Sequence, residues 1–131
     1  MTRILLLGYD PTTLDFSDPA LPPGMTVEKV NAGIAVALKQ FAERGWESDL
    51  CLIGPDESAV PAVALQLRST TYDCVVIGGG VRLMTGGLAR FEAIVNAVHQ
   101  AAPSAVIAFN SRPDDSAAAA ARGLALASQA V

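Results

Sequence analysis

Residues Tyr72–Arg82 read YDCVVIGGGVR, a short apolar run that is followed at once by three glycines. The run does not alternate between polar and apolar residues, which is typical of a strand buried on both faces of a sheet. Glycines after such a strand permit positive φ angles and let backbone N–H groups approach an anion. The stretch therefore predicts an inner parallel strand that ends in a candidate binding turn.

Three other stretches have the same apolar character, and helical patterns separate them. The predicted strands are Ile4–Gly8, Asp49–Ile53, Cys74–Gly78 and Ala105–Phe109. The predicted helices are Val27–Arg44, with Thr26 as N-cap and Gly45 as C-terminal stop, Ala59–Arg68, Leu88–Ala101, and a last one from Pro113 to about Ser128. Strands that alternate with helices run parallel and have right-handed crossovers.

This order predicts a single α/β domain over residues 1–131, a three-layer α/β/α sandwich with a four-stranded parallel sheet. The first and third strands are the most apolar and should lie centrally. We therefore predict the strand order 2-1-3-4.

The composition narrows the range of partners. Hydrophobic residues make up 51% of the chain, charged residues make up 17%, and the net charge is −4. An acidic chain with scattered basic residues offers no surface for nucleic acid. No apolar run is long enough for a signal peptide or a membrane span, so we expect a cytoplasmic protein with no membrane contact. Cys51 and Cys74 are expected to be buried thiols without a disulfide, and no metal-ligand pattern occurs.

Residues 9–25, YDPTTLDFSDPALPPGM, form an unusually long predicted loop. Loops of this length in compact domains commonly carry function, and its prolines favour a stiff, extended chain. Asp15 and Asp18 are expected to cap local turns through side-chain bonds to backbone N–H groups.

The carboxyl ends of the predicted strands meet at one edge of the sheet, where ligands bind in folds of this type. The candidate site residues at this edge are Tyr9, Asp10, Gly79, Gly80, Arg82, Asn110 and Arg112. Backbone N–H groups of residues 79–81 would hold an anion, with the two arginines as charge partners and Asn110 as a neutral hydrogen-bonding group. Alternatively, the glycines form a tight turn, and Arg82 pairs with Asp10 or Asp15. Tyr9 either lines the edge as a stacking surface or packs in the core with its hydroxyl satisfied.

These residues favour a module that binds a small anionic ligand carrying a phosphate or a carboxylate. A second hypothesis is an enzyme that uses Asp10 as a general base or nucleophile beside the arginines. A third is a structural protein whose alanine-rich last helix forms a homodimer, although its small residues favour packing of that helix on its own sheet. The residues identify neither a cofactor nor a catalytic group.

Familiar nucleotide motifs are missing: GYDPTT follows the first strand in place of GxGxxG, and no P-loop occurs. The stretches GYDPTTLDFSDPALPPGMT (8–26), YDCVVIGGGVR (72–82) and FNSRPDD (109–115) resemble small bacterial proteins of doubly wound, flavodoxin-like or Rossmann-like fold. That resemblance implies the same fold. It carries no assigned activity, so it transfers no site residues.

Overall fold

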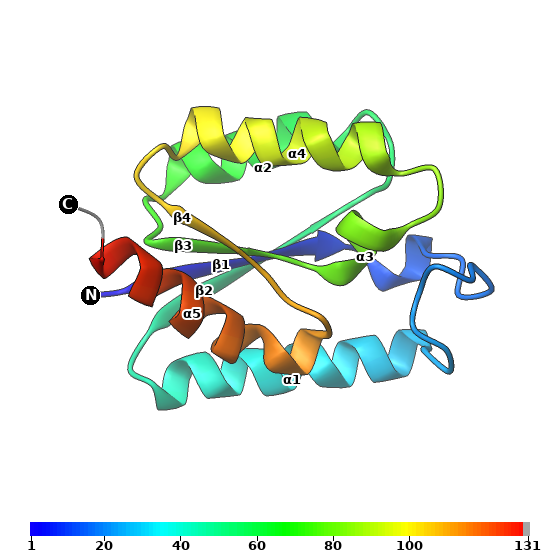
Figure 1. Cartoon of the computed structure of the whole chain (residues 1–131), viewed down its shortest axis with the longest axis horizontal. Helices are drawn as coiled ribbons and strands as arrows, with labels where there is room; N and C mark the ends of the chain where they lie inside the picture. The colour runs from blue at the N-terminus through cyan, green and yellow to red at the C-terminus, as the bar shows by residue number, and fades with distance from the viewer. Residues whose placement is uncertain (130–131) are drawn as a thin grey trace.

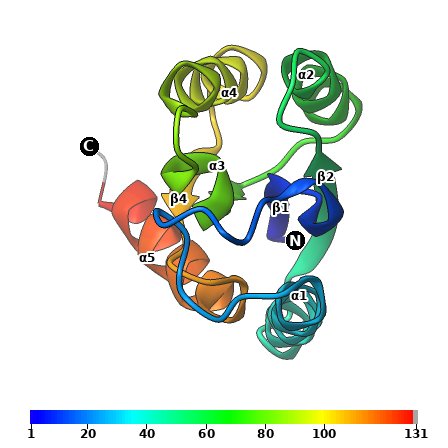
Figure 2. The ribbon, with the colours of Figure 1, turned by 90° about the vertical axis from the view of Figure 1, so that its right-hand side faces the viewer.

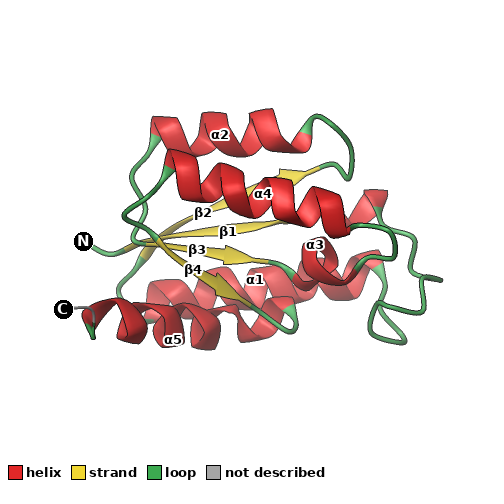
Figure 3. Ribbon diagram, turned by 45° about the horizontal axis from the view of Figure 1, so that its top comes forward, coloured by secondary structure: helices red, strands yellow, loops and turns green. Residues whose placement is uncertain are grey.

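A computed structural model describes residues 1–129 of the chain. Its single sheet contains β1 (Arg3–Tyr9), β2 (Glu47–Ile53), β3 (Cys74–Ile77) and β4 (Val106–Phe109) in the order β2-β1-β3-β4. All strand pairs are parallel, and Figure 3 shows the arrows pointing the same way. The predicted strand order and parallel sheet are confirmed.

Helices cover both faces of the sheet, as Figure 1 shows. The helices α2 (Ala59–Ser69) and α4 (Leu88–Ala101) lie side by side on one face. The helices α1 (Val27–Glu43) and α5 (Ser116–Ser128) cover the other face. The three-layer α/β/α architecture is therefore as predicted.

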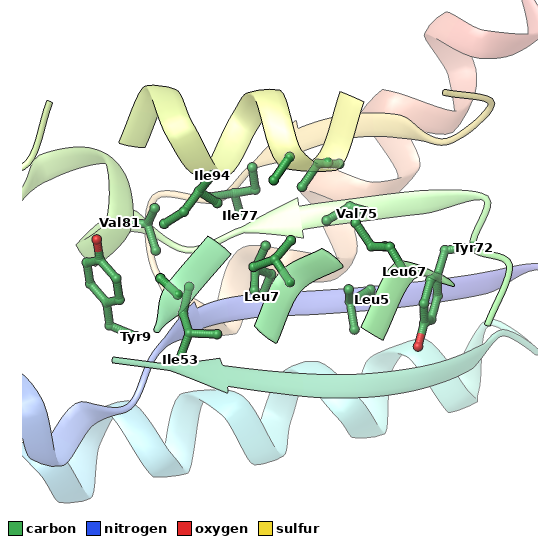
Figure 4. Packing of buried hydrophobic residues seen from close by; sticks show 14 residues of the cluster. Leu5, Leu7, Tyr9, Ile53, Leu67, Tyr72, Val75, Ile77, Val81 and Ile94 are labelled. Carbon is green, nitrogen blue, oxygen red and sulfur yellow. The ribbon is translucent and has the colours of Figure 1, made fainter. Parts of the chain in front are cut away.

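The core divides into two clusters because successive side chains of a strand point to opposite faces. On β1, Leu5, Leu7 and Tyr9 belong to the cluster under α2 and α4. Figure 4 shows these three side chains on the same side of the sheet. Ile4 and Leu6 belong to the cluster under α1 and α5, which also contains Phe41. This alternation decides which side of the sheet each residue at the end of β1 can reach.

The ends of α1 follow from local sequence. The Thr26 hydroxyl accepts a hydrogen bond from the Lys29 N–H at 3.1 Å, which satisfies a donor that the helix itself leaves unpaired. At the other end Gly45 has a φ of 76°, a left-handed conformation that glycine adopts without strain. Both predicted end signals are confirmed, and the helix positions residues 30 and 34 beneath the sheet edge.

The three glycines after β3 differ from their prediction. They open a short helix, α3 (Gly79–Leu83), and the positive-φ glycines within residues 1–129 lie elsewhere. A Cβ added at Gly79 would lie 3.3 Å from the Ser111 carbonyl oxygen, and one added at Gly78 would lie 3.5 Å from the Gly8 Cα. The glycines therefore allow backbone segments to pack closely, and the prediction of positive φ angles in this turn is wrong.

The alanine-rich helix α5 lies on its own sheet. Its buried residues include Ala117, Ala120 and Gly123, and a Cβ at Gly123 would approach the Ala108 Cβ to 3.3 Å. Small residues on this face let α5 pack closely over β3 and β4. None of the helices formed by residues 1–129 has the length and apolar character that a membrane-spanning segment needs.

Both cysteines are free thiols in β-strands, as predicted. Cys74 is buried as predicted, but Cys51 lies on the edge strand β2 and is only half-buried, so its predicted burial is wrong. Burial, together with the neighbouring Asp73 charge, raises the pKa of the Cys74 thiol to about 12. That thiol therefore stays protonated at neutral pH and acts as a small apolar core residue.

Candidate functional site

A cavity of about 90 Å³ lies at the carboxyl ends of the strands, on the side of the sheet that α1 covers. We call it the edge cavity. Its apolar walls are Leu6, Leu14, Phe16, Leu21, Met25, Val30, Ile34, Leu50, Leu52 and Leu83. Its polar side is formed by the backbone of residues 78–80 and by residues 110–112. The long predicted loop supplies the outer wall, and Figure 2 shows this segment crossing the end of the sheet on its way to α1.

Gly8 leaves open space in the wall of this cavity. Ile4 and Leu6 fill the same face of β1, so the strand pattern calls for a third large side chain at position 8. A Cβ added at Gly8 would meet no atom within 4 Å. The sheet therefore has a hole where a core residue would ordinarily sit.

Asn110 lines the edge cavity and has a buried acceptor that is unpaired among the described residues. Its side chain is buried, with 3% of the residue exposed. Its Nδ2 donates to the Ser116 hydroxyl at 2.9 Å, and that hydroxyl donates onward to the Pro113 carbonyl at 2.6 Å. This chain fixes the orientation of the amide because the Ser116 oxygen has no second proton to give. The Asn110 Oδ1 is left without a hydrogen-bond donor among the described residues.

The two predicted arginines are already engaged. The Arg82 Nη2 donates to the Asn110 carbonyl oxygen at 3.1 Å. The Arg112 Nε lies 3.0 Å from the Asp114 Oδ1, and its side chain is 63% exposed at the cavity mouth. Neither arginine pairs with Asp10 or Asp15, so the alternative pairing is wrong. Arg82 ties α3 to the end of β4 and does not line the edge cavity.

Asp10 acts as a helix cap. Its Oδ1 accepts hydrogen bonds from the Thr12 N–H at 3.0 Å and the Thr12 hydroxyl at 2.8 Å, at the start of the 3₁₀ turn Pro11–Thr13. These two bonds lower the pKa of the Asp10 carboxyl below its usual value. A carboxylate with a lowered pKa is a weaker base, which does not favour the proposed catalytic role.

The loop is held in place by its own aspartates. Asp15 accepts from the Ser17 N–H at 3.0 Å and Asp18 accepts from the Ala20 N–H at 2.9 Å, so both predicted turn caps are confirmed. Asp18 also accepts from the Thr85 N–H at 2.8 Å, across 67 positions of sequence. This contact fastens the loop to the connection between α3 and α4.

Substituting Asp18→Ala is expected to release the loop from that connection. The Thr85 and Ala20 amides lose their acceptor, so their hydrogen exchange should accelerate several-fold. The matched control Asp15→Ala removes only the contact with Ser17 and should leave the Thr85 exchange unchanged. Unchanged Thr85 exchange in Asp18→Ala would show that this contact does not hold the loop.

The same contact is expected to weaken in acid. Hydrogen bonds from Thr85 and Ala20 lower the pKa of the Asp18 carboxyl below 3.8. A depressed carboxylate pKa means that the stabilisation is present above 3.8 and is lost as the pH falls through the lowered value. After correction for its intrinsic rate, exchange of the Thr85 amide should therefore be constant near neutral pH and should accelerate as the pH falls below 3.8.

The structure brings five of the predicted site residues to the edge cavity: Tyr9, Gly79, Gly80, Asn110 and Arg112. Asp10 and Arg82 lie outside its lining. The sequence interpretation placed Gly8 at the end of the first strand but left it, and the apolar residues of the loop, out of the candidate site. The signal for Gly8 was the interruption of the apolar pattern after Ile4 and Leu6. No group of His, Cys, Asp or Glu within residues 1–129 is arranged to hold a metal ion.

Comparison with protein-family models found no match, and comparison with curated proteins also found none.

Proposed function

We propose that the protein binds a small molecule with an apolar body and one hydrogen-bond donor in the edge cavity. The observation that carries this proposal is the Asn110 Oδ1, a buried acceptor without a partner among the described residues. Leaving such an atom unpaired costs about 1–3 kcal/mol, which a donor on a ligand recovers. The apolar walls provide the remaining affinity through burial of carbon atoms.

The size of the cavity limits the ligand. A buried water needs about 10–15 Å³ of cavity volume, so the edge cavity, with about 90 Å³, accommodates several waters or a small organic group. The apolar walls disfavour a charged group inside because an unpaired buried charge loses its hydration. If the ligand also carries the phosphate or carboxylate predicted from the sequence, we place that group at the mouth, beside Arg112.

Binding is a better proposal than catalysis for this cavity. Its lining contains no Ser–His or Cys–His pair within the described residues, and the Asp10 carboxylate is engaged by Thr12. The unpaired Asn110 Oδ1 can orient a ligand through one hydrogen bond, which gives specificity without a reaction.

A matched pair of ligands tests the proposal. Hexanamide and heptan-2-one have the same shape, but only the amide has N–H donors. We expect hexanamide to bind about tenfold more tightly, because the ketone leaves the Asn110 Oδ1 unpaired. The affinity is measured by titration in ¹⁵N–¹H correlation spectra, in which the amides of residues 8, 79 and 80 should shift.

Asn110→Ala is expected to remove the preference for the amide, since the acceptor is then absent. Asn96→Ala makes the same change at an exposed position of α4, away from the cavity, and should keep the preference. Equal affinity of the wild-type protein for the two ligands, or a preference that survives in Asn110→Ala, would contradict the assignment.

A further inference from the structure

A second cavity of about 310 Å³ lies on the opposite side of the sheet edge, beside the start of α4. We call it the α4 cavity. It is lined by Tyr9, Pro55, Met84, Gly86, Gly87, Ala89, Arg90 and Ala93. It faces α4, whereas the edge cavity faces α1, and Tyr9 lies between the two and lines both.

The Tyr9 hydroxyl is the first sign that the α4 cavity takes a ligand. Tyr9 is 5% exposed, and its hydroxyl has no hydrogen-bond partner among the described residues. Figure 4 shows its ring rising from β1 on the side where α4 lies, with the hydroxyl directed away from β2. The prediction of a core tyrosine with a satisfied hydroxyl is therefore only half correct, because the ring is buried and the hydroxyl is unpaired.

The beginning of α4 supplies further unused donors. The N-cap residue is Gly87, which has no side chain to accept from the first turn of the helix. The first hydrogen bond of the helix runs from the Phe91 N–H to the Gly87 carbonyl. The N–H groups of residues 88–90 therefore have no acceptor within the helix. The positive end of a helix of 14 residues attracts anions.

Arg90 adds a full positive charge at the same place. It lines the α4 cavity and forms no ion pair within residues 1–129. Burial raises the pKa of the Tyr9 hydroxyl, and the Arg90 charge partly offsets that rise, so the two groups are close enough to interact. The hydroxyl thus stays protonated and able to donate near neutral pH.

One negative group lies nearby and limits the charge of a ligand. The pKa of the Asp56 carboxyl is lowered mainly by hydrogen bonds from Ser58 and further by the Arg90 charge. Its Oδ1 accepts from the Ser58 N–H at 2.9 Å, which keeps this carboxylate engaged. A single arginine opposite one carboxylate suits a singly charged ligand better than a doubly charged phosphate.

We propose that the α4 cavity binds the carboxylate group of a small molecule, held by the Tyr9 hydroxyl, the Arg90 guanidinium and the first N–H groups of α4. The carbon walls formed by Pro55, Met84 and Ala93 would contact the apolar part of the same molecule. This site is independent of the ligand proposed for the edge cavity.

Benzoate is the probe for this site, and inorganic phosphate is its comparison. In ¹⁵N–¹H spectra of the whole protein, benzoate is expected to shift the amides of residues 87–90 and to bind more tightly than phosphate. Arg90→Gln should weaken benzoate binding roughly tenfold. Tyr9→Phe, which removes only an unpaired hydroxyl and keeps the ring, should weaken it about fivefold.

Two controls distinguish binding in the α4 cavity from a general effect of protein charge and from binding in the edge cavity. Arg68→Gln makes the same change of charge at an exposed position of α2 and should leave benzoate binding unchanged. Gly8→Val, which fills the edge cavity, should also leave it unchanged. The proposal is overturned if benzoate does not shift residues 87–90, if Arg68→Gln weakens binding as much as Arg90→Gln, or if Tyr9→Phe binds as tightly as the wild type.

Discussion

Valine in place of Gly8 is expected to abolish hexanamide binding in the edge cavity while the protein stays folded. The Gly8 Cα faces open space, with no atom within 4 Å of an added Cβ. The new side chain continues the row formed by Ile4 and Leu6 and occupies the volume that the ligand needs. The change adds apolar contacts to the core instead of removing any.

The stability of Gly8→Val is what makes the loss of binding informative. Glycine in a strand costs roughly 0.5–1 kcal/mol relative to alanine, and β-branched residues favour strands. We therefore expect the free energy of unfolding, measured by urea denaturation, to be equal to that of the wild type or higher. The control Gly33→Val places a Cβ 3.0 Å from the Pro113 Cβ and should lower it. Hexanamide binding that persists in Gly8→Val would exclude the edge cavity as its site.

Phe41→Ala is expected to lower the free energy of unfolding by about 3–5 kcal/mol, the largest change in stability that we predict. Phe41 is 0% exposed and packs α1 against the sheet. Its ring lies 6.2 Å from that of Trp46, measured between ring centroids, so truncation removes this aromatic contact and leaves a cavity in the core. Urea denaturation followed by circular dichroism measures the loss.

Leu65→Ala provides the matched comparison for Phe41→Ala. Leu65 is also a helical apolar residue, but it is 71% exposed on α2. Surface substitutions of this kind change stability by less than about 0.5 kcal/mol. Similar losses for the two variants would contradict the assignment of Phe41 to the core.

The strands and long helices were predictable because their signals are local and repeated. The apolar runs around Leu5, Val75 and Ile107 have no polar alternation, and the helical spacing of Val27, Val30 and Ile34 is regular. The strand order was also predictable, because the most apolar strands lie at the centre of a parallel sheet, between neighbouring strands and under helices on both faces.

The conformations and contacts at the carboxyl ends of the strands were not predictable, because they depend on segments that are distant in the sequence. Three consecutive glycines have low helix propensity, yet residues 79–83 form a helix in which Gly79 packs closely against the Ser111 carbonyl. Arg82 was expected to face an anion and instead donates to the Asn110 carbonyl. The open space at Gly8 depends on where the loop and α1 lie relative to β1, and local sequence patterns do not determine those positions.

The two proposed sites place unpaired buried groups on opposite sides of the same edge. The Asn110 Oδ1 is an acceptor at the edge cavity, and the Tyr9 hydroxyl is a donor at the α4 cavity. Buried polar groups in folded proteins are nearly always paired, so two such atoms at one edge are the features that the fold alone does not explain.

A crystal structure of the protein soaked with hexanamide tests the central claim most directly. We predict density for the ligand in the edge cavity, with its amide nitrogen about 2.7–3.2 Å from the Asn110 Oδ1 and its alkyl chain between Leu6 and Leu21. An edge cavity that stays empty at saturating hexanamide, or that is filled by side chains of residues 14–25, would contradict it.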